Sequence, residues 1–184
     1  MKNLLKALSV LVLPLLGAAW AGPIPETQDS TTGFLSFDLP AEQAGIFELS
    51  FDATPLADKI DGFTGVSASV PNVANDVAAM VRFADTGNID VRNGGFFKAD
   101  QALKYAAGKA YRVRMAVDVA KRTYSVFVTP PGQPEVSLAR NYAFRTQQSA
   151  VKSLGKLVIA GFKGPDGFFA GALRVSGVSL KTAP

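Results

Sequence analysis

The segment 111–129 alternates between apolar and polar side chains with a period of two, and no other feature of the chain constrains its fold as strongly. A period of two places successive side chains on opposite faces of a β-strand. The alternation pauses at the short polar turn 120–122 and then resumes. We therefore predict a long β-hairpin with one buried face. The side chains expected on that face include Val113, Met115, Val117, Val126 and Val128.

Further strands are expected wherever the same period, or a short apolar run, stands between turn residues. The expected ranges are 47–52, 63–70, 80–83, 88–91, 157–162 and 173–180, with another strand starting at Val136. Both faces of 173–180 carry apolar side chains, so we expect burial on both sides. The segment 98–107 favours a loop followed by a strand over a helix, and 146–153 has room for one helical turn. Many short strands between Gly and Pro turns indicate an all-β domain, either a two-sheet sandwich or a barrel.

Residues 1–21 have the pattern of a secretory signal peptide. Lys2 and Lys6 supply the positive start, an apolar run follows, and Ala19-Trp20-Ala21 is the small-x-small pattern of a cleavage site. A membrane anchor is the alternative, but a proline and several glycines interrupt the run. We therefore expect export to the periplasm, the cell surface or the extracellular space, with no membrane span after cleavage of the signal.

Residues 22–32 are rich in proline and threonine without a period, so we expect an extended N-terminal arm there. A single β-sandwich domain is expected over 33–184, and its oligomeric state is left open. Removal of the two signal lysines lowers the net charge from +4 to +2, and the remaining charges are interspersed. A nucleic-acid binder needs a basic stripe with interleaved aromatic residues, so we expect no nucleic-acid partner.

The sequence contains no histidine and no cysteine. Their absence excludes a Ser-His-Asp triad, a Cys-His dyad, imidazole or thiolate metal sites, and disulfide bonds. A chain of this length buries enough surface to fold without covalent cross-links. Any catalysis would have to use Asp, Glu, Lys, Tyr, Ser or Thr.

Three stretches carry a resemblance to a known superfamily. The segments YRVRMAVDV (111–119) and YSVFV (124–128) resemble the central hairpin of concanavalin A-like lectin/glucanase domains, the laminin-G-like jelly rolls. The stretch FFAGALRV (168–175) resembles the closing strand of that superfamily, and 142–148 is similar to a secreted bacterial module of this type. The resemblance implies a jelly-roll form of two-sheet antiparallel β-sandwich. Modules of this kind often stand beside polysaccharide-degrading domains.

Catalytic carboxylates are scarce. Hydrolysis of glycans usually requires two carboxylates about 5–9.5 Å apart. No two of the four glutamates have a spacing that puts both on one strand face, and Asp52 is the one Asp at such a spacing from Glu48. A solvated surface pair is the simpler interpretation of Glu48 and Asp52. Alginate lyases that resemble this fold use a Gln-x-His element and a tyrosine, and the missing histidine removes that route. A tyrosine base beside an arginine such as Arg112 or Arg145 is the remaining alternative. We predict no catalytic residues and no enzyme.

Calcium is the one metal that this composition suits, because its ligands are carboxylate and carbonyl oxygens. Asp58 and Asp61 lie in one turn and Asp166 lies in another. Neither turn has the alternating acidic residues of a calcium loop, and ordinary Asx turns explain both. We predict no metal site and no cofactor, with a structural calcium ion as the alternative.

The best candidate for a glycan site surrounds the turn 93–95. Its members combine aromatic rings, which can stack on a sugar, with charged and amide groups, which can bond hydroxyls. The candidates are Asp90, Arg92, Asn93, Phe96, Phe97 and Tyr105. We expect the two phenylalanines on a loop, and their packing against the end of the core is the alternative. The only tryptophan lies in the signal, and its loss weakens the glycan interpretation.

Three classes of function remain. The first is a secreted, non-catalytic module that binds a carbohydrate or another component of the cell envelope. The second is a structural or protein-interaction subunit of a surface complex, and the third is a polysaccharide-degrading enzyme. An enzyme predicts a cleft with convergent carboxylates, a lectin predicts aromatic side chains on a sheet or loop face, and a partner protein predicts a large apolar patch. We favour the first class.

Overall fold

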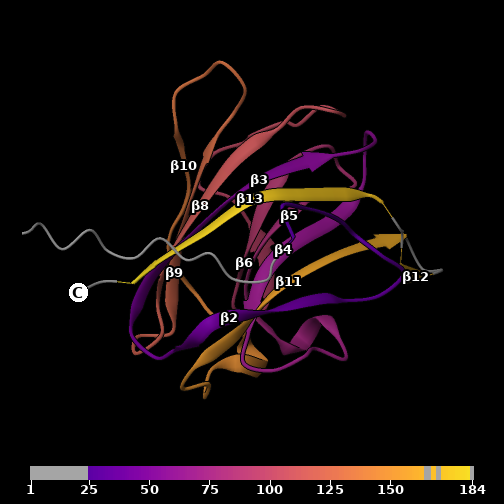
Figure 1. The fold of residues 1–184 in the computed structure, drawn as a ribbon. Helices are drawn as coiled ribbons and strands as arrows, with labels where there is room; N and C mark the ends of the chain where they lie inside the picture. The colour runs from indigo at the N-terminus through magenta and orange to yellow at the C-terminus, as the bar shows by residue number, and fades with distance from the viewer. Residues whose placement is uncertain (1–24, 164–166, 169–170, 183–184) are drawn as a thin grey trace, which may run out of the picture.

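The computed structural model describes residues 25–163, 167–168 and 171–182. These residues form two antiparallel β-sheets packed face to face (Figure 1). The expected all-β, two-sheet sandwich is therefore confirmed. Within the described ranges no helix is long and apolar enough to cross a membrane. The expected signal peptide 1–21 lies outside the described residues, so export stays a prediction.

Sheet A has the strand order β1-β13-β3-β8-β9-β10. Its strands are β1 (Thr27–Asp29), β3 (Ile46–Pro55), β8 (Tyr111–Asp118), β9 (Thr123–Thr129), β10 (Val136–Ala143) and β13 (Leu173–Thr182). The first and last segments of the domain meet in this sheet, since β1 pairs with β13 and β13 pairs with β3. Three residues of the segment expected to be an extended arm are thus part of the sandwich.

Sheet B has the order β12-β11-β4-β5-β6-β7, and β2 also pairs with β11. Its strands are β2 (Leu35–Gln43), β4 (Asp61–Ser67), β5 (Val77–Phe83), β6 (Ile89–Asn93), β7 (Phe96–Lys98), β11 (Leu154–Lys163) and β12 (Gly167–Phe168). Two short 3-10 helices, η1 (Ala74–Asp76) and η2 (Thr146–Gln148), interrupt the strands. The second is the helical turn expected within 146–153, and the segment after β7 forms a loop rather than a helix.

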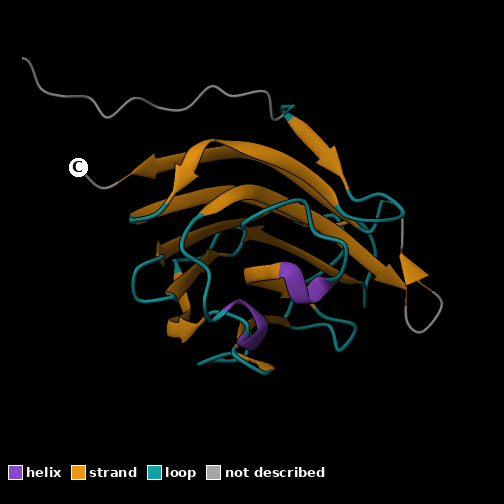
Figure 2. Cartoon of the chain, turned by 90° about the horizontal axis from the view of Figure 1, so that it is seen from below, coloured by secondary structure: helices purple, strands orange, loops and turns teal. Residues whose placement is uncertain are grey.

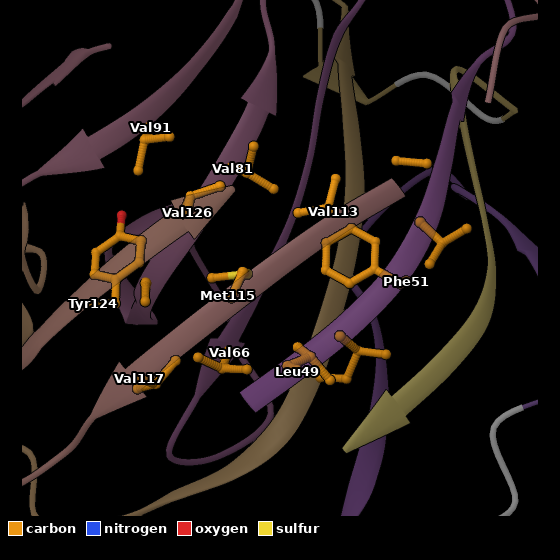
Figure 3. Packing of buried hydrophobic residues seen from close by; sticks show 14 of the residues in the cluster. Leu49, Phe51, Val66, Val81, Val91, Val113, Met115, Val117, Tyr124 and Val126 are labelled. Carbon is orange, nitrogen blue, oxygen red and sulfur yellow. The ribbon is translucent and has the colours of Figure 1, made fainter. Parts of the chain in front are cut away.

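The main core lies between the two sheets (Figure 3). The predicted hairpin is strands β8 and β9, in which Met115 lies opposite Val126 and Val113 opposite Val128. All five side chains predicted on its buried face are at most 1% exposed. Phe51 and Leu49 of β3 pack beside them and are fully buried. Burial of each such side chain contributes about 1.5–3 kcal/mol, so this face is a major source of stability.

Strand β13 contains a β-bulge. Its pairing with β3 shifts between Ser176 and Ser179, and Gly177 has a φ of 56°. A bulge adds one residue and so exchanges the faces of a strand. Leu173 and Leu180 therefore both face the core, although their numbers differ in parity. The expectation of burial on both faces was wrong, because the bulge brings both apolar sets to one face.

One edge of sheet A is closed by a segment of sheet B. The backbone N–H of Asp100 donates to the carbonyl of Leu138 on β10 (2.9 Å). At the other end of β10, Gly94 N–H donates to the carbonyl of Ala143 (3.2 Å). The hairpin β6–β7 and the loop after it thus run along β10 and join the two sheets.

Candidate functional site

A second apolar cluster lies on the face of sheet B that points away from sheet A. In β5, Val81 and Phe83 face the main core, so the alternating Met80 and Arg82 face outward. We call the outward set the outer-face cluster. It contains the buried residues Phe63, Val77, Met80, Val158 and Ala160, with Phe34, Phe97 and Phe162 packed against them. Buried apolar side chains on the outer face of a sheet need a cover, which here comes from loops.

The outer-face cluster forms the floor of a pocket of about 240 Å³. Strands β4, β5, β7 and β11 supply the floor, and the segments around η1 and η2 supply the rim. The lining residues are Asp61, Phe63, Ala74, Met80, Arg82, Phe97, Arg145 and Phe162. The two short helices contact each other and lie on the same side of the sandwich (Figure 2). The pocket therefore combines a rigid sheet floor with a loop rim.

Arg82 links the charged groups on the floor. Its Nε and Nη2 donate to the two carboxylate oxygens of Asp90 (2.9 and 2.7 Å), and its Nη1 lies 3.7 Å from Oδ1 of Asp61. Its guanidinium also lies 3.7 Å from the ring centroid of Phe97. Burial is the largest influence and lowers the pKa of Arg82, but the hydrogen bonds to Asp90 and the charges of Asp90, Asp61 and Asp85 together outweigh it, so the pKa is raised. Burial raises the pKa of Asp61, although the charge of Arg82 opposes that shift.

Arg145 lies on the rim and is only 5% exposed. Its backbone N–H donates to the carbonyl of Ala78 (2.8 Å), which fixes the loop against the start of β5. Its Nη1 donates to Oδ1 of Asn75 (2.9 Å), and its Nη2 lies 3.6 Å from the sulfur of Met80. Its buried Nε has no hydrogen-bond partner among the described residues. Burial, and then the charge of Arg92, lower the pKa of Arg145 to about 10, so Arg145 is still a cation at neutral pH.

Three of the six predicted site residues come together beside this pocket. Asp90 holds Arg82, and the guanidinium of Arg92 lies 5.0 Å from the ring centroid of Phe97. Arg92 and Phe97 are directly paired across strands β6 and β7, so they share the outer face. Arg92 also donates to the carbonyls of Gly94 and Gly95, which fixes the turn.

The other two residues of the β6–β7 hairpin lie on its opposite face. Asn93 and Phe96 are a cross-strand pair that alternates with Arg92 and Phe97. The side-chain oxygen of Asn93 accepts a hydrogen bond from the N–H of Ala143 (3.0 Å), and Phe96 is 60% exposed. The two phenylalanines lie on a short strand rather than on the expected loop. Of these two phenylalanines, only Phe97 lines the pocket.

Tyr105 is in the main core and not beside the pocket. It is 8% exposed, its ring packs edge-on against Phe83, and its hydroxyl donates to the carbonyl of Ala84 (2.7 Å). Burial raises the pKa of its hydroxyl to about 12. Its grouping with the other five residues was wrong, because the loop before β8 turns this ring inward between the sheets.

The remaining acidic candidates are separated. Asp58 accepts a hydrogen bond from the N–H of Ala107 (3.0 Å), whereas Asp61 faces Arg82 in the pocket. Within the described residues no three potential metal ligands form a group, and Asp166 lies outside them. Glu48 and Asp52 share the outer face of sheet A, where Arg114 and Arg112 pair with them at 3.0 and 3.5 Å.

Most residues of the pocket are not predicted as site residues from the sequence. Arg82 carries the one signal that could have found it, since it is a charged residue inside the otherwise apolar strand 77–83. Arg145 was considered only as a neighbour of a catalytic tyrosine, and Asp61 only as a calcium ligand. Phe63 and Phe162 are 99 residues apart in the chain, and the pairing of β4 with β11 brings them together.

The sandwich has the concanavalin A-like lectin/glucanase fold. Similar solved structures include a sialidase (TM-score 0.55, 16% identity, 85% of this chain and 15% of that one). The GH131 β-glucanase catalytic domain from Podospora anserina has a TM-score of 0.53 at 12% identity, over 86% of this chain and 71% of that one. Lectin II from Ulex europaeus also has a TM-score of 0.53 at 12% identity, and the match covers 83% of this chain and 82% of the lectin chain. The expected superfamily resemblance is thus confirmed for the fold.

One sequence relative is a gellan lyase from Bacillus sp. It is 34% identical over 111 residues, which are 58% of this chain. The chain spans only 4% of the length of that lyase, so the similarity concerns one small part of a much larger protein. No protein-family model matches the chain.

Proposed function

We propose that this domain is a non-catalytic module that binds a carbohydrate in the pocket on the outer face of sheet B. The observation that carries the proposal is the composition of this pocket. Aromatic rings line it together with a carboxylate and two arginines. A sugar unit has apolar faces edged by hydroxyls, so a site for it needs apolar walls and a few fixed polar groups.

The size of the pocket suits a small part of a ligand. Its volume of about 240 Å³ is below the roughly 300–1,000 Å³ of pockets that hold drug-sized molecules. One sugar unit, at a chain end or within a chain, is therefore the proposed occupant. The sheet floor is rigid, because Arg82 and Asp90 hold each other across β5 and β6, and such preorganisation lowers the cost of binding.

A second candidate is a module that works beside a polysaccharide-degrading enzyme. The similarity to part of a gellan lyase favours it. Catalysis by the domain itself is disfavoured, because Asp61 is the one carboxylate among the residues that line the pocket. Asp90 lies nearby, but both of its oxygens are engaged by Arg82.

Binding to immobilised or gel-embedded polysaccharides tests the proposal. We expect Phe97→Ala to weaken binding about tenfold. The substitution removes an apolar wall of the pocket and also the aromatic ring that the guanidinium of Arg82 contacts. Phe127→Ala is the matched control. Phe127 is also a half-buried phenylalanine under an arginine, with Arg114 at 4.0 Å from its centroid, but it lies on sheet A.

The panel should hold neutral and acidic polysaccharides and should be measured with the folded protein. If Phe97→Ala and Phe127→Ala weakened binding equally, the binding site would not be this pocket. Absence of binding to every polymer would instead favour the structural or protein-interaction role.

A further inference from the structure

Arg145 differs in its side-chain partners from the arginines that form close ion pairs. Arg82, Arg114 and Arg174 each pair with at least one carboxylate at 2.7 Å. Their side chains are 22%, 32% and 47% exposed. Arg145 is more buried than any of them, yet within the described residues its side-chain partners are a neutral amide and a thioether sulfur.

An unpaired buried charge is unfavourable, and proteins normally pair it or neutralise it. Neutralisation does not occur here at neutral pH, because arginine keeps its proton. A thioether is a weak acceptor, and the Nε–H has no acceptor among residues 25–163, 167–168 and 171–182. Within this part of the chain, Arg145 is thus a cation in the wall of a pocket without a counter-charge.

The charged groups that the structure describes around the pocket do not supply this counter-charge. Asp90 is bound on both oxygens by Arg82, and Asp61 lies beside the same guanidinium. Arg92, which lies beside the pocket, donates to backbone carbonyls, and its charge disfavours the charged form of Arg145. The side of the pocket near Arg92 and Arg145 is therefore positive.

We infer that the sugar unit bound in this pocket is a uronate, and that its carboxylate lies against Arg145 as the missing counter-charge. This inference rests on the proposed carbohydrate-binding function. A guanidinium matches a carboxylate in shape and charge, and such charge-assisted contacts are stronger than neutral hydrogen bonds. The rest of the pocket is suited to the neutral part of the sugar, with apolar walls and with Oδ1 of Asp61, which accepts no hydrogen bond among the described residues, as a hydroxyl acceptor.

The test compares polymers that differ only in the charge of one group. Polygalacturonate, alginate and hyaluronan are each measured against the same polymer after chemical reduction of its carboxyl groups, by calorimetry on the full chain. We expect the wild-type protein to bind at least one acidic polymer about tenfold or more tightly than its reduced form. Dextran sulfate is included to separate carboxylate from sulfate recognition.

Variants locate the effect. Arg145→Met should lose the preference for the acidic polymer and keep the weak binding of the reduced one, whereas Arg145→Lys should retain part of the preference. Arg140→Met is the control, since Arg140 is an exposed arginine on β10. The melting temperature of Arg145→Met should be equal to or above that of the wild type, because the substitution removes an unpaired buried charge.

The outcomes separate the two proposals. Equal binding of acidic and reduced polymers would overturn the uronate assignment and leave the carbohydrate-binding function standing. Tighter binding of dextran sulfate than of every uronate polymer would overturn the choice of carboxylate. No binding to any polymer would overturn both, and an unchanged preference in Arg145→Met would remove Arg145 from the site. The polymer comparison uses the wild-type protein, so it decides even if Arg145→Met does not fold.

Discussion

Tyr124 and Arg145 show how differently two buried polar side chains can be accommodated. The hydroxyl of Tyr124 accepts a hydrogen bond from the N–H of Met80 (3.3 Å) and lies against the carbonyl of Arg92. It therefore joins β9 to two strands of sheet B and stabilises the sandwich. Among the described residues the Nε–H of Arg145 has no acceptor, and a buried polar group without a partner is rare enough to require an explanation.

Gly65 on β4 is the position where an added methyl group would be most disruptive. A Cβ atom there would lie 2.4 Å from the carbonyl oxygen of Ala79 and 2.8 Å from a methyl group of Val77. We expect Gly65→Ala to lower the free energy of unfolding by about 1–3 kcal/mol or more, measured by urea denaturation. Gly45→Ala is the control, since nothing lies within 4 Å of the added atom, and it should change stability by less than about 0.5 kcal/mol. Equal effects would contradict the close packing of β4 on β5.

At the scale of elements, the length of a strand determined whether the sequence could predict it. Strands β8 and β9 were predicted because 8 and 7 residues show a period of two clearly. Strands β1 and β7 have 3 residues each, too few for a period, and they form through pairing with β13 and β6. Because of the bulge, the apolar side chains of β13 do not follow one continuous period of two, and the sequence therefore suggested burial on both faces.

Met115 tests the assignment of the buried face of the β8–β9 hairpin. Met115→Ala should lower the free energy of unfolding by about 2–5 kcal/mol, because the side chain is fully buried and the cavity would be lined by rigid strands. Thr129→Ala, on the other face of the hairpin, should cost less than about 1 kcal/mol. A loss below about 0.5 kcal/mol for Met115→Ala in a denaturation series would contradict this register.

At the scale of the whole molecule, the sequence could predict the class of fold but not the order of the strands. Pairing of β3 with β13 joins segments that are more than 100 residues apart, and no local pattern specifies it. Most residues of the candidate site could not be predicted for the same reason. The pocket floor combines β4, β5, β7 and β11, which are distant in the chain. Phe97 and its neighbours Asp90 and Arg92 were predicted because they lie in one local hairpin, whereas Phe63 and Phe162 were not.

The whole-molecule arrangement also predicts no turnover of polysaccharides by the isolated protein. A pair of suitably spaced carboxylates is missing from the residues that line the pocket. The tyrosines are unsuitable as bases, because all four are buried, and burial raises the pKa of Tyr105, Tyr124 and Tyr142. Assays of reducing ends and of unsaturated products over neutral and acidic polymers should stay at background. Turnover that disappears in folded Asp61→Asn would contradict this prediction.

The segment that runs along β10 has a further consequence for the behaviour of the protein in concentrated solution. Open strand edges are templates on which other copies can add strands and build fibrillar aggregates. Here Asp100 and Gly94 donate to carbonyls of β10, and the side chain of Gln101 donates to the carbonyl of Ser137 (2.9 Å). Three backbone carbonyls along this edge are thus already occupied within the molecule and cannot recruit a neighbour. This edge is thereby protected against self-association through added strands.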